Sequence, residues 1–313
     1  MMSSLDKVRA AGLDKRGNRN VKEASIGFLL LLAASISVAT TLAVIFALSS
    51  ETIGFFADPA VTFQEFFTGR QWTPLFSGAQ QHFGISPLIL GTLLVTLIAL
   101  VVGLPLGLGS AIYLSEFASS TARRRVVPVL ELLAGIPTVV LGYFALLTVT
   151  PALQKIVPGL NIFNPLSAGI VMGFMILPTV SSISIDAMQA VPRALRDAAY
   201  GLGAAQHEVI IKVVIPAALS GIVAAFILAM SRAIGETMIV ALAAGQKPTF
   251  TFDPRETIAT MTSFIVQAAT GDQPSGSLAS RALYAVGSTL FLMTLTLNII
   301  SQQVVKRFGE KYE

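Results

Sequence analysis

The 313-residue chain contains no cysteine and only two histidines, His82 and His207, which lie far apart in the sequence. A chain without cysteine can form neither a disulfide framework nor a thiolate metal site. Two distant histidines make a histidine-based metal site equally improbable, so no bound metal is expected. No Gly-Lys pair occurs anywhere, which excludes a phosphate-binding loop of the G-x-x-x-x-G-K-[ST] type. If ATP powers the protein, another chain must bind it, and we expect no cofactor on this one.

Charged residues are also scarce, at 12% of the chain against 54% hydrophobic residues. An ordinary soluble domain carries roughly 25% charged residues. At half that density, ionic groups cannot cover the surface, so lipid must face part of it. The composition therefore predicts a helical integral membrane protein and excludes a soluble enzyme.

Six apolar runs are long enough to be transmembrane helices, each of which needs about 20 residues. These runs cover residues 24–50, 86–114, 126–152, 156–185, 213–246 and 282–305. Glu131 interrupts the third run, and Arg232 and Glu236 interrupt the fifth. Residues 158–165, at the start of the fourth run, have the Pro and Gly content of a loop. The fold class predicted is all-α, a polytopic bundle of six spans.

The basic residues orient these spans. Of the 21 Lys and Arg, 15 lie in the two terminal tails and in the loops after spans two and four, whereas five lie in the alternate loops. Because cytoplasmic segments carry the excess of Lys and Arg, both termini are predicted to be cytoplasmic in a multi-pass cell-membrane protein. The same distribution explains the net charge of +4 without nucleic acid.

The chain divides accordingly into five parts. Residues 1–23 form a basic cytoplasmic tail, without fixed structure or lying on the membrane surface, and residues 24–50 form an anchor helix. Residues 51–85 form an external loop, and its aromatic residues indicate that part of it lies at the membrane interface. Residues 86–305 hold five spans, and residues 306–313 a second cytoplasmic tail. The alternative for 24–50 is a cleaved signal peptide, but its 27 uncharged residues exceed the 7–15 of such peptides.

The loop of residues 191–216 is the first segment that suggests function. Pro192 suits a first helical position, so a short helix over residues 193–200 can end at Gly201 or Gly203, which tolerate a left-handed conformation. A second short helix is expected over 204–214. The result is an Ala-rich knob that can fit into a groove on a partner. The alternative is an ordinary basic loop that sets topology.

This loop resembles the E-A-A-x-x-x-G motif of ABC-importer permeases, which is followed nine residues later by I-x-L-P. Asp197, Ala198 and Ala199 occupy the E-A-A positions, Gly203 the glycine, and Val213-x-Ile215-Pro216 the last element. In that family the loop forms a helix that docks on the ATPase. The resemblance therefore implies two ATPase subunits bound at this loop, with Arg193 at its start.

The second segment that suggests function is Ser231-Arg-Ala-Ile-Gly-Glu-Thr-Met238 in the fifth run. A charge at the centre of a membrane helix costs roughly 2.5–3.5 kcal/mol. Arg232 and Glu236 are four residues apart, so on a continuous helix they share a face. One interpretation is a buried ion pair that stabilises the bundle. The other is an anion path, because the arginine fork donates two hydrogen bonds to a phosphate and keeps its charge.

This segment is similar to the R-A-x-G-E-T of the phosphate-specific transport permeases, PstC and its partner PstA. The continuation Glu-Thr-Met-Ile-Val and the segments 111–117 and 135–143 resemble the PstC type more closely. The resemblance implies a type I ABC-importer permease fold over residues 86–305 and a path for phosphate at Arg232, Glu236 and Thr237. It also implies a homologous PstA-type permease, an external phosphate-binding protein, and no catalytic residues on this chain.

Three alternatives remain at this stage. One is a permease for another oxyanion, such as sulfate, molybdate or phosphonate. A second is a self-contained secondary transporter or channel, which predicts internal repeats or more charges near the midplane. A third is a structural or signalling membrane subunit that transports nothing.

Overall fold

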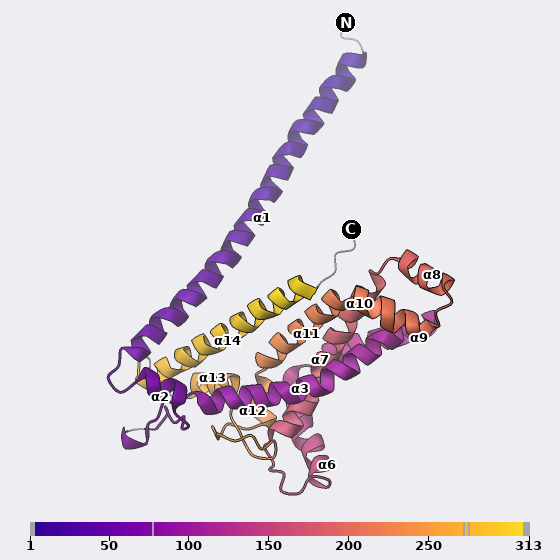
Figure 1. The fold of residues 1–313 in the computed structure, drawn as a ribbon. Helices are drawn as coiled ribbons and strands as arrows, with labels where there is room; N and C mark the ends of the chain where they lie inside the picture. Colours follow the sequence, from indigo (N-terminus) through magenta and orange to yellow (C-terminus); the bar gives the residue numbers. More distant parts are fainter. Residues whose placement is uncertain (1–3, 77, 272, 275, 309–313) are drawn as a thin grey trace. The chain divides into compact units, whose positions relative to one another are not determined.

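The computed structural model describes residues 4–76, 78–271, 273–274 and 276–308 (Figure 1). The chain forms two compact units, residues 1–51 and residues 52–313. Nearly all of the first unit is helix α1 (Ser4–Phe56). This helix is longer at both ends than the predicted anchor, and it includes most of the segment expected to be a tail. The chain has no proline before Pro59, so nothing interrupts the helix until just before that residue.

The second unit is also helical in its described part, with one isolated bridge between Trp72 and Phe83. Its longer helices are α3 (Ser86–Ile112), α4 (Ser120–Ala134), α7 (Pro165–Gln189), α11 (Leu219–Ile234) and α14 (Leu278–Phe308). The shorter ones are α2 (Phe63–Thr68), α5 (Thr138–Phe144), α6 (Thr150–Gln154), α8 (Arg193–Gly201), α9 (Gln206–Val209), α10 (Ile215–Ala217), α12 (Met238–Ala243) and α13 (Met261–Thr270). Three π-helical turns, η2 (Tyr113–Phe117), η3 (Ala145–Val149) and η4 (Ile210–Val214), and the 3-10 turn η1 (Gly78–Gln80) complete them.

Four helical stretches in the described residues are long and apolar enough to cross a membrane: 23–56, 86–117, 165–189 and 278–303. Two bent pairs, 120–134 with 138–154 and 206–217 with 219–234, bring the number to six if each pair is one span. The predicted helical bundle is confirmed. The predicted tail of residues 306–313 lies outside the described residues from 309 onward, and α14 continues to Phe308.

The third and fifth spans are not the single continuous helices that we predicted. The third bends by 90° at Gly135-Ile136-Pro137, where the proline has no amide hydrogen to continue the helix. The fifth bends by 68° at Ala218, next to Pro216. Helix α11, which follows this bend, ends at Ile234, and Met238–Ala243 form the separate helix α12. The fifth predicted run therefore contains two interruptions that its uniform hydropathy conceals.

Close packing of α3 against α7 forms the centre of the second unit, and small residues make it possible. A Cβ atom on Gly107 would lie 2.7 Å from the Cβ of Val180, and one on Gly173 would lie 2.8 Å from the Cβ of Val102. The absence of side chains at such positions lets two membrane helices approach closely. The surrounding core includes Met172, Ile176 and Ile239, all fully buried.

An aromatic cluster closes the α2 end of the unit. Trp72 packs edge-on against Phe66 and Phe264, and both Trp72 and Phe66 are 1% exposed. The rings of Trp72 and Phe66 therefore pack against protein, and the expectation that part of segment 51–85 lies at the membrane interface does not depend on them. It stays open for Phe63, Phe67 and Phe76, which are exposed. Trp72 is buried because its ring packs against Phe264 of α13.

A third apolar cluster lies at the opposite end of α3, beside α8 and α9 (Figure 1). It contains Leu114, Met188, Val191, Val209 and Val214, all buried. Leu195 and Ala199 of α8 pack against it. This cluster is the base on which the 191–216 loop rests.

Candidate functional site

The 191–216 loop folds into two consecutive short helical segments, close to the prediction. Helix α8 begins at Arg193, with Pro192 as its N-cap and not its first residue. The chain turns after α8 at Gly203, which has a φ of +84° that glycine adopts without strain. The second segment is α9, η4 and α10 in succession, which together lead into α11. The loop is therefore a compact projection and not an unstructured connection.

Most motif residues of this loop are exposed, and one packs against the apolar base of the loop. Asp197 and Ala198 are exposed, whereas Ala199 is half-buried against the apolar base of the loop. Arg193 and Pro216 are exposed as well, and Pro216 lies at the bend before α11. An exposed strip of small residues next to a carboxylate is a suitable surface for another protein, because α8 can approach that protein closely.

An ion pair that we did not predict holds α8 in place. Arg196 Nη1 donates to Glu116 Oε2 over 2.6 Å, and Arg196 Nη2 donates to the carbonyl of Met188 over 2.7 Å. The side chains of Arg196 and Glu116 are only 20% and 8% exposed. Gln206 adds a hydrogen bond to the Glu116 carbonyl over 2.9 Å. The available signal was an acidic residue at the end of span two, next to segments rich in arginine that were predicted to be cytoplasmic.

The interruption between α11 and α12 carries the second set of predicted residues. Arg232 lies in the last turn of α11 and is exposed. Its Nη1 donates to Thr179 Oγ1 of α7 over 3.2 Å. Thr179 follows Pro178, which lacks the amide hydrogen of a regular helix. Arg232 is thus a cation on the surface of this chain, with donor groups left over for a ligand or a second protein.

Glu236 does not share a helix face with Arg232, because α11 ends at Ile234 between them. The carboxylate is 9% exposed, and its Oε1 accepts the amide hydrogens of Met238 and Ile239 over 3.0 and 3.2 Å. In this position it caps α12, where a negative charge is favourable. No ion pair joins Arg232 and Glu236 in the described part of the chain. The prediction of a shared face is wrong.

Further hydrogen bonds fix the shape of this interruption. Thr237 Oγ1 donates to the Gly235 carbonyl over 3.1 Å, and Thr262 Oγ1 donates to the Glu236 carbonyl over 2.7 Å. Thr260 and Thr92 extend the network, because Thr262 contacts the Thr260 hydroxyl and Thr92 accepts the Met261 amide hydrogen. The backbone at the interruption is therefore held in one arrangement by α13 and α3. A fixed, non-helical backbone of this kind is typical of substrate sites in transporters.

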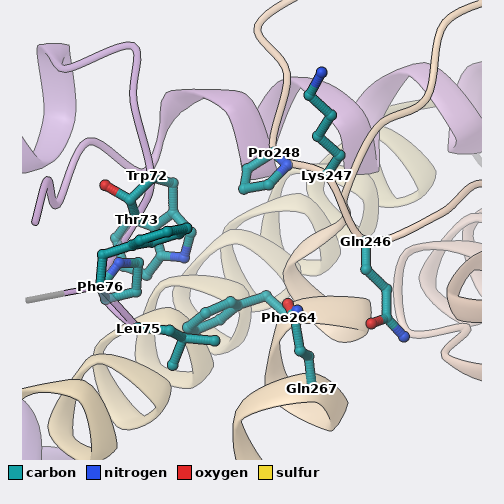
Figure 2. Close-up of a pocket in the computed structure, with 10 residues that line it drawn as sticks. Trp72, Thr73, Leu75, Phe76, Gln246, Lys247, Pro248, Phe264 and Gln267 are labelled. Atoms are coloured by element: carbon teal, nitrogen blue, oxygen red, sulfur yellow. The ribbon is translucent and has the colours of Figure 1, made fainter. Parts of the chain in front are cut away.

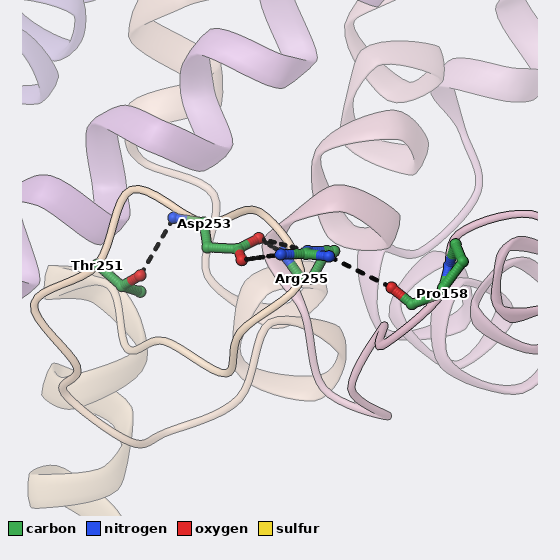
Figure 3. A network of polar contacts seen from close by, with 4 residues as sticks. All are labelled: Pro158, Thr251, Asp253 and Arg255. Carbon is green, nitrogen blue, oxygen red and sulfur yellow. Dashed lines mark hydrogen bonds and ion pairs between the residues drawn. The ribbon is translucent and has the colours of Figure 1, made fainter.

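Two features mark the end of the unit away from α8. Asp253 accepts from Arg255 Nε and Nη2 over 2.9 and 2.6 Å, and Arg255 Nη1 reaches the Pro158 carbonyl over 3.4 Å (Figure 3). The Arg255 guanidinium lowers the pKa of Asp253 to about 2. The second feature is a cavity of about 320 Å³ that is lined by residues 72–76, residues 246–248 and two residues of α13, Phe264 and Gln267 (Figure 2). Its walls are largely apolar, and neither Arg232 nor any residue of α8 lines it.

The chain resembles known transport proteins over most of its length. Residues 103–312 match the family of binding-protein-dependent transport system inner membrane components. The chain is 31% identical over 295 residues to a probable ABC transporter permease protein, YqgH, of Bacillus subtilis, with 94% of each chain covered. It is 34% identical over 269 residues to the phosphate transport system permease protein PstC of Mesorhizobium japonicum, with 79% of each covered.

Solved structures resemble the fold. A bacterial ABC transporter involved in the import of alginate superposes with a TM-score of 0.60 at 15% identity, over 93% of this chain and all of that one. An inward-facing MetNI methionine ABC transporter gives 0.56 at 17% identity, over 70% of this chain and 94% of that one. The predicted fold of an ABC-importer permease is thereby confirmed.

Proposed function

This chain belongs to the family of binding-protein-dependent transport system inner membrane components, and we propose that it is the membrane-spanning permease subunit of an ATP-driven importer of inorganic phosphate. The observation that carries the proposal is the anchored docking loop. Helix α8 presents Asp197 and Ala198 outward, while the Arg196–Glu116 pair fixes it to η2, the turn that follows α3. Because α8 is fixed in this way, movement of a protein bound to α8 would also move the spans.

Phosphate is proposed as the substrate because several relatives named PstC are 30–34% identical to this chain. Arg232 supports the assignment, since an exposed guanidinium beside the Thr179 hydroxyl suits a tetrahedral oxyanion. Thr237 lies in the same interruption and offers a hydroxyl group, while Glu236 shapes the site by capping α12. Movement of α11 between its bend at Ala218 and its end at Ile234 would expose Arg232 to each side in turn.

The proposed assembly contains a second, homologous permease of the PstA type. Exposed apolar side chains on the elements around Arg232 support it, among them Val140 and Leu147 near α5 and Leu228 on α11, which are 55%, 68% and 51% exposed. Part of this surface would meet the second permease, and the remainder lipid. Arg232 would then line a path between two subunits instead of facing lipid.

Two ATPase subunits would dock on the α8 segments of the two permeases, and an extracytoplasmic phosphate-binding protein would deliver substrate at the opposite end. ATP would be bound and hydrolysed by the ATPases, so this chain has no catalytic residue and no cofactor of its own in the proposal. The distribution of Lys and Arg supports a cell-membrane orientation with both termini, and the α8 loop, in the cytoplasm.

Reconstitution tests the function. The chain, a PstA-type permease and the ATPase are placed in liposomes, the binding protein and radiolabelled phosphate are added outside, and ATP is enclosed within. Phosphate uptake should require ATP, the ATPase and the binding protein, and excess sulfate, molybdate or phosphonate should not compete. Uptake of phosphate without the ATPase would indicate a secondary transporter or channel. Competition by another oxyanion would transfer the substrate assignment to that anion.

A further inference from the structure

A cationic pocket beside α8 is separate from the interruption that holds Arg232. Its volume is about 270 Å³, several times the roughly 30 Å³ share of one water molecule. Ser115, Arg123, Gln189, Val191, Arg193 and Arg196 line it. These residues come from η2, α4, the end of α7 and α8, so four segments of the same unit converge there.

The pocket concentrates positive charge. Arg123 lies at the start of α4, and Arg193 and Arg196 lie at the start of α8. The first turn of a helix already carries partial positive charge from its free amide hydrogens, and neither α4 nor α8 has an acidic residue there. None of the lining residues in the described part of the chain is acidic. Glu116 balances one of the three guanidinium groups through its ion pair with Arg196.

The side chains suit an anion with several oxygen atoms. Arg123 is half-buried and Arg193 is exposed, so two guanidinium groups from different segments can approach a ligand. Gln189 adds an amide donor from the end of α7. Planar guanidinium groups donate paired hydrogen bonds to phosphate oxygens. Asp197 and Ala198 of α8 do not line the pocket, so Arg193 is the one predicted docking residue that also lines it.

We propose that this pocket binds a phosphate-group anion at the cytoplasmic ends of α3 and α7. The phosphate group comes either from free inorganic phosphate in the cytoplasm or from the headgroup of an anionic membrane lipid. Basic pockets between membrane helices on the cytoplasmic side are suited to such headgroups. The assignment of this end to the cytoplasm rests on the proposed function, but the binding chemistry does not.

Binding here would influence the docking loop directly. Arg196 both lines the pocket and holds Glu116, so a bound phosphate group lies next to the contact that fixes α8. Occupancy of the pocket is therefore coupled to the position of the helix proposed to meet the ATPase.

The test uses the full-length chain carrying Arg232→Gln, which removes the cation of the proposed transport path. In maltoside micelles, binding of radiolabelled orthophosphate is measured at equilibrium. In parallel, chain extracted from membranes of phosphatidylglycerol and phosphatidylcholine is examined by native mass spectrometry for retained lipid. Each measurement is repeated with Arg123→Gln, with Arg193→Gln and with the control Arg124→Gln. Arg124 is an exposed neighbour that contacts the Ser120 carbonyl and does not line the pocket.

We expect Arg123→Gln and Arg193→Gln each to weaken the binding of one of the two ligands by about tenfold or more, because each removes a charged hydrogen-bond donor to the phosphate oxygens. Arg124→Gln should change neither. Loss of orthophosphate binding identifies the free anion, and loss of retained phosphatidylglycerol identifies the lipid headgroup. If neither probe binds the chain with its pocket intact, or if Arg124→Gln weakens binding as strongly, the proposal is overturned. The uptake assay above is independent of this result, so the two proposals fail separately.

Discussion

Glu116 and Arg196 are 80 residues apart in the sequence, and their side chains meet at 2.6 Å between η2, the turn that follows α3, and helix α8. The pair is mostly shielded from solvent and is supported by the Met188 carbonyl and by Gln206. The ion pair therefore connects the turn at the end of a long membrane helix to the loop proposed to contact the ATPase.

Removing the charge of Glu116 should weaken this link. Glu116→Gln leaves the Arg196 guanidinium without its ionic partner, at a cost of about 1–3 kcal/mol. The melting temperature of the purified chain should fall by several degrees, and phosphate uptake per ATP hydrolysed should fall in the reconstituted importer. Glu208→Gln is the matched control, because Glu208 pairs with Lys212 on the exposed surface and such pairs contribute little. Equal effects of the two variants would contradict the link.

The role of Glu236 as a helix cap predicts graded effects. Glu236→Ala removes the acceptor for two amide hydrogens of α12 and should destabilise the chain by about 0.5–2 kcal/mol. Glu236→Gln keeps an acceptor oxygen and should cost less. The melting temperatures of both variants check this order.

A double-mutant cycle separates this role from an ion pair. Because Arg232 and Glu236 do not pair, Arg232→Gln and Glu236→Gln should be additive in stability to within about 0.5 kcal/mol. A coupling energy well above that value would instead indicate the buried ion pair that the sequence suggested.

The packing of α3 predicts opposite outcomes for two glycines in one helix. A Cβ at Gly107 would lie 2.7 Å from the Val180 Cβ, whereas a Cβ at Gly109 meets nothing within 4 Å. Gly107→Ala should therefore destabilise the chain by about 1–3 kcal/mol. Gly109→Ala should stabilise it by about 0.5–1 kcal/mol, since alanine favours a helix over glycine. Thermal unfolding of the two variants measures the contrast, and similar shifts in both would mean that α3 and α7 do not pack this closely.

The Asp253–Arg255 contact predicts a pH dependence in the 246–260 segment. The pKa of Asp253 is lowered to about 2 by Arg255, from roughly 3.9 in an unfolded chain. The carboxylate therefore stabilises the folded segment fully above about pH 4, and the effect is lost as the pH falls toward 2.

The absence of cysteine makes this prediction accessible to a site-specific probe. A spin label attached through Phe252→Cys, at a side chain that is 72% exposed, should become more mobile as the pH falls from about 4 to about 2. With Asp253→Asn as a second substitution, the label should be mobile throughout and lose its pH dependence. A label whose mobility changes with pH equally in both chains would contradict the contact.

Hydropathy and charge predicted the helical bundle and the position of the 191–216 loop, because both depend on local sequence. They did not predict the bends at Gly135-Ile136-Pro137 and Ala218, since an apolar run has the same hydropathy whether straight or broken. The break after Ile234 was missed for a related reason. Glu236 caps a helix that starts two residues later, and spacing alone could not distinguish this from a shared helix face. The Glu116–Arg196 contact depends on how distant segments fold together.

The central claim concerns Arg232 as part of a phosphate path in an ATP-driven importer. Its most direct test is the initial rate of ATP-dependent phosphate uptake by the reconstituted importer with Arg232→Gln, compared with the wild-type chain and with Arg124→Gln. We predict at least a tenfold loss for Arg232→Gln, because a charged hydrogen bond worth roughly 1.5–3 kcal/mol is removed, and a wild-type rate for Arg124→Gln. Undiminished uptake by Arg232→Gln, or no ATP-dependent phosphate uptake by the wild-type importer, would contradict it.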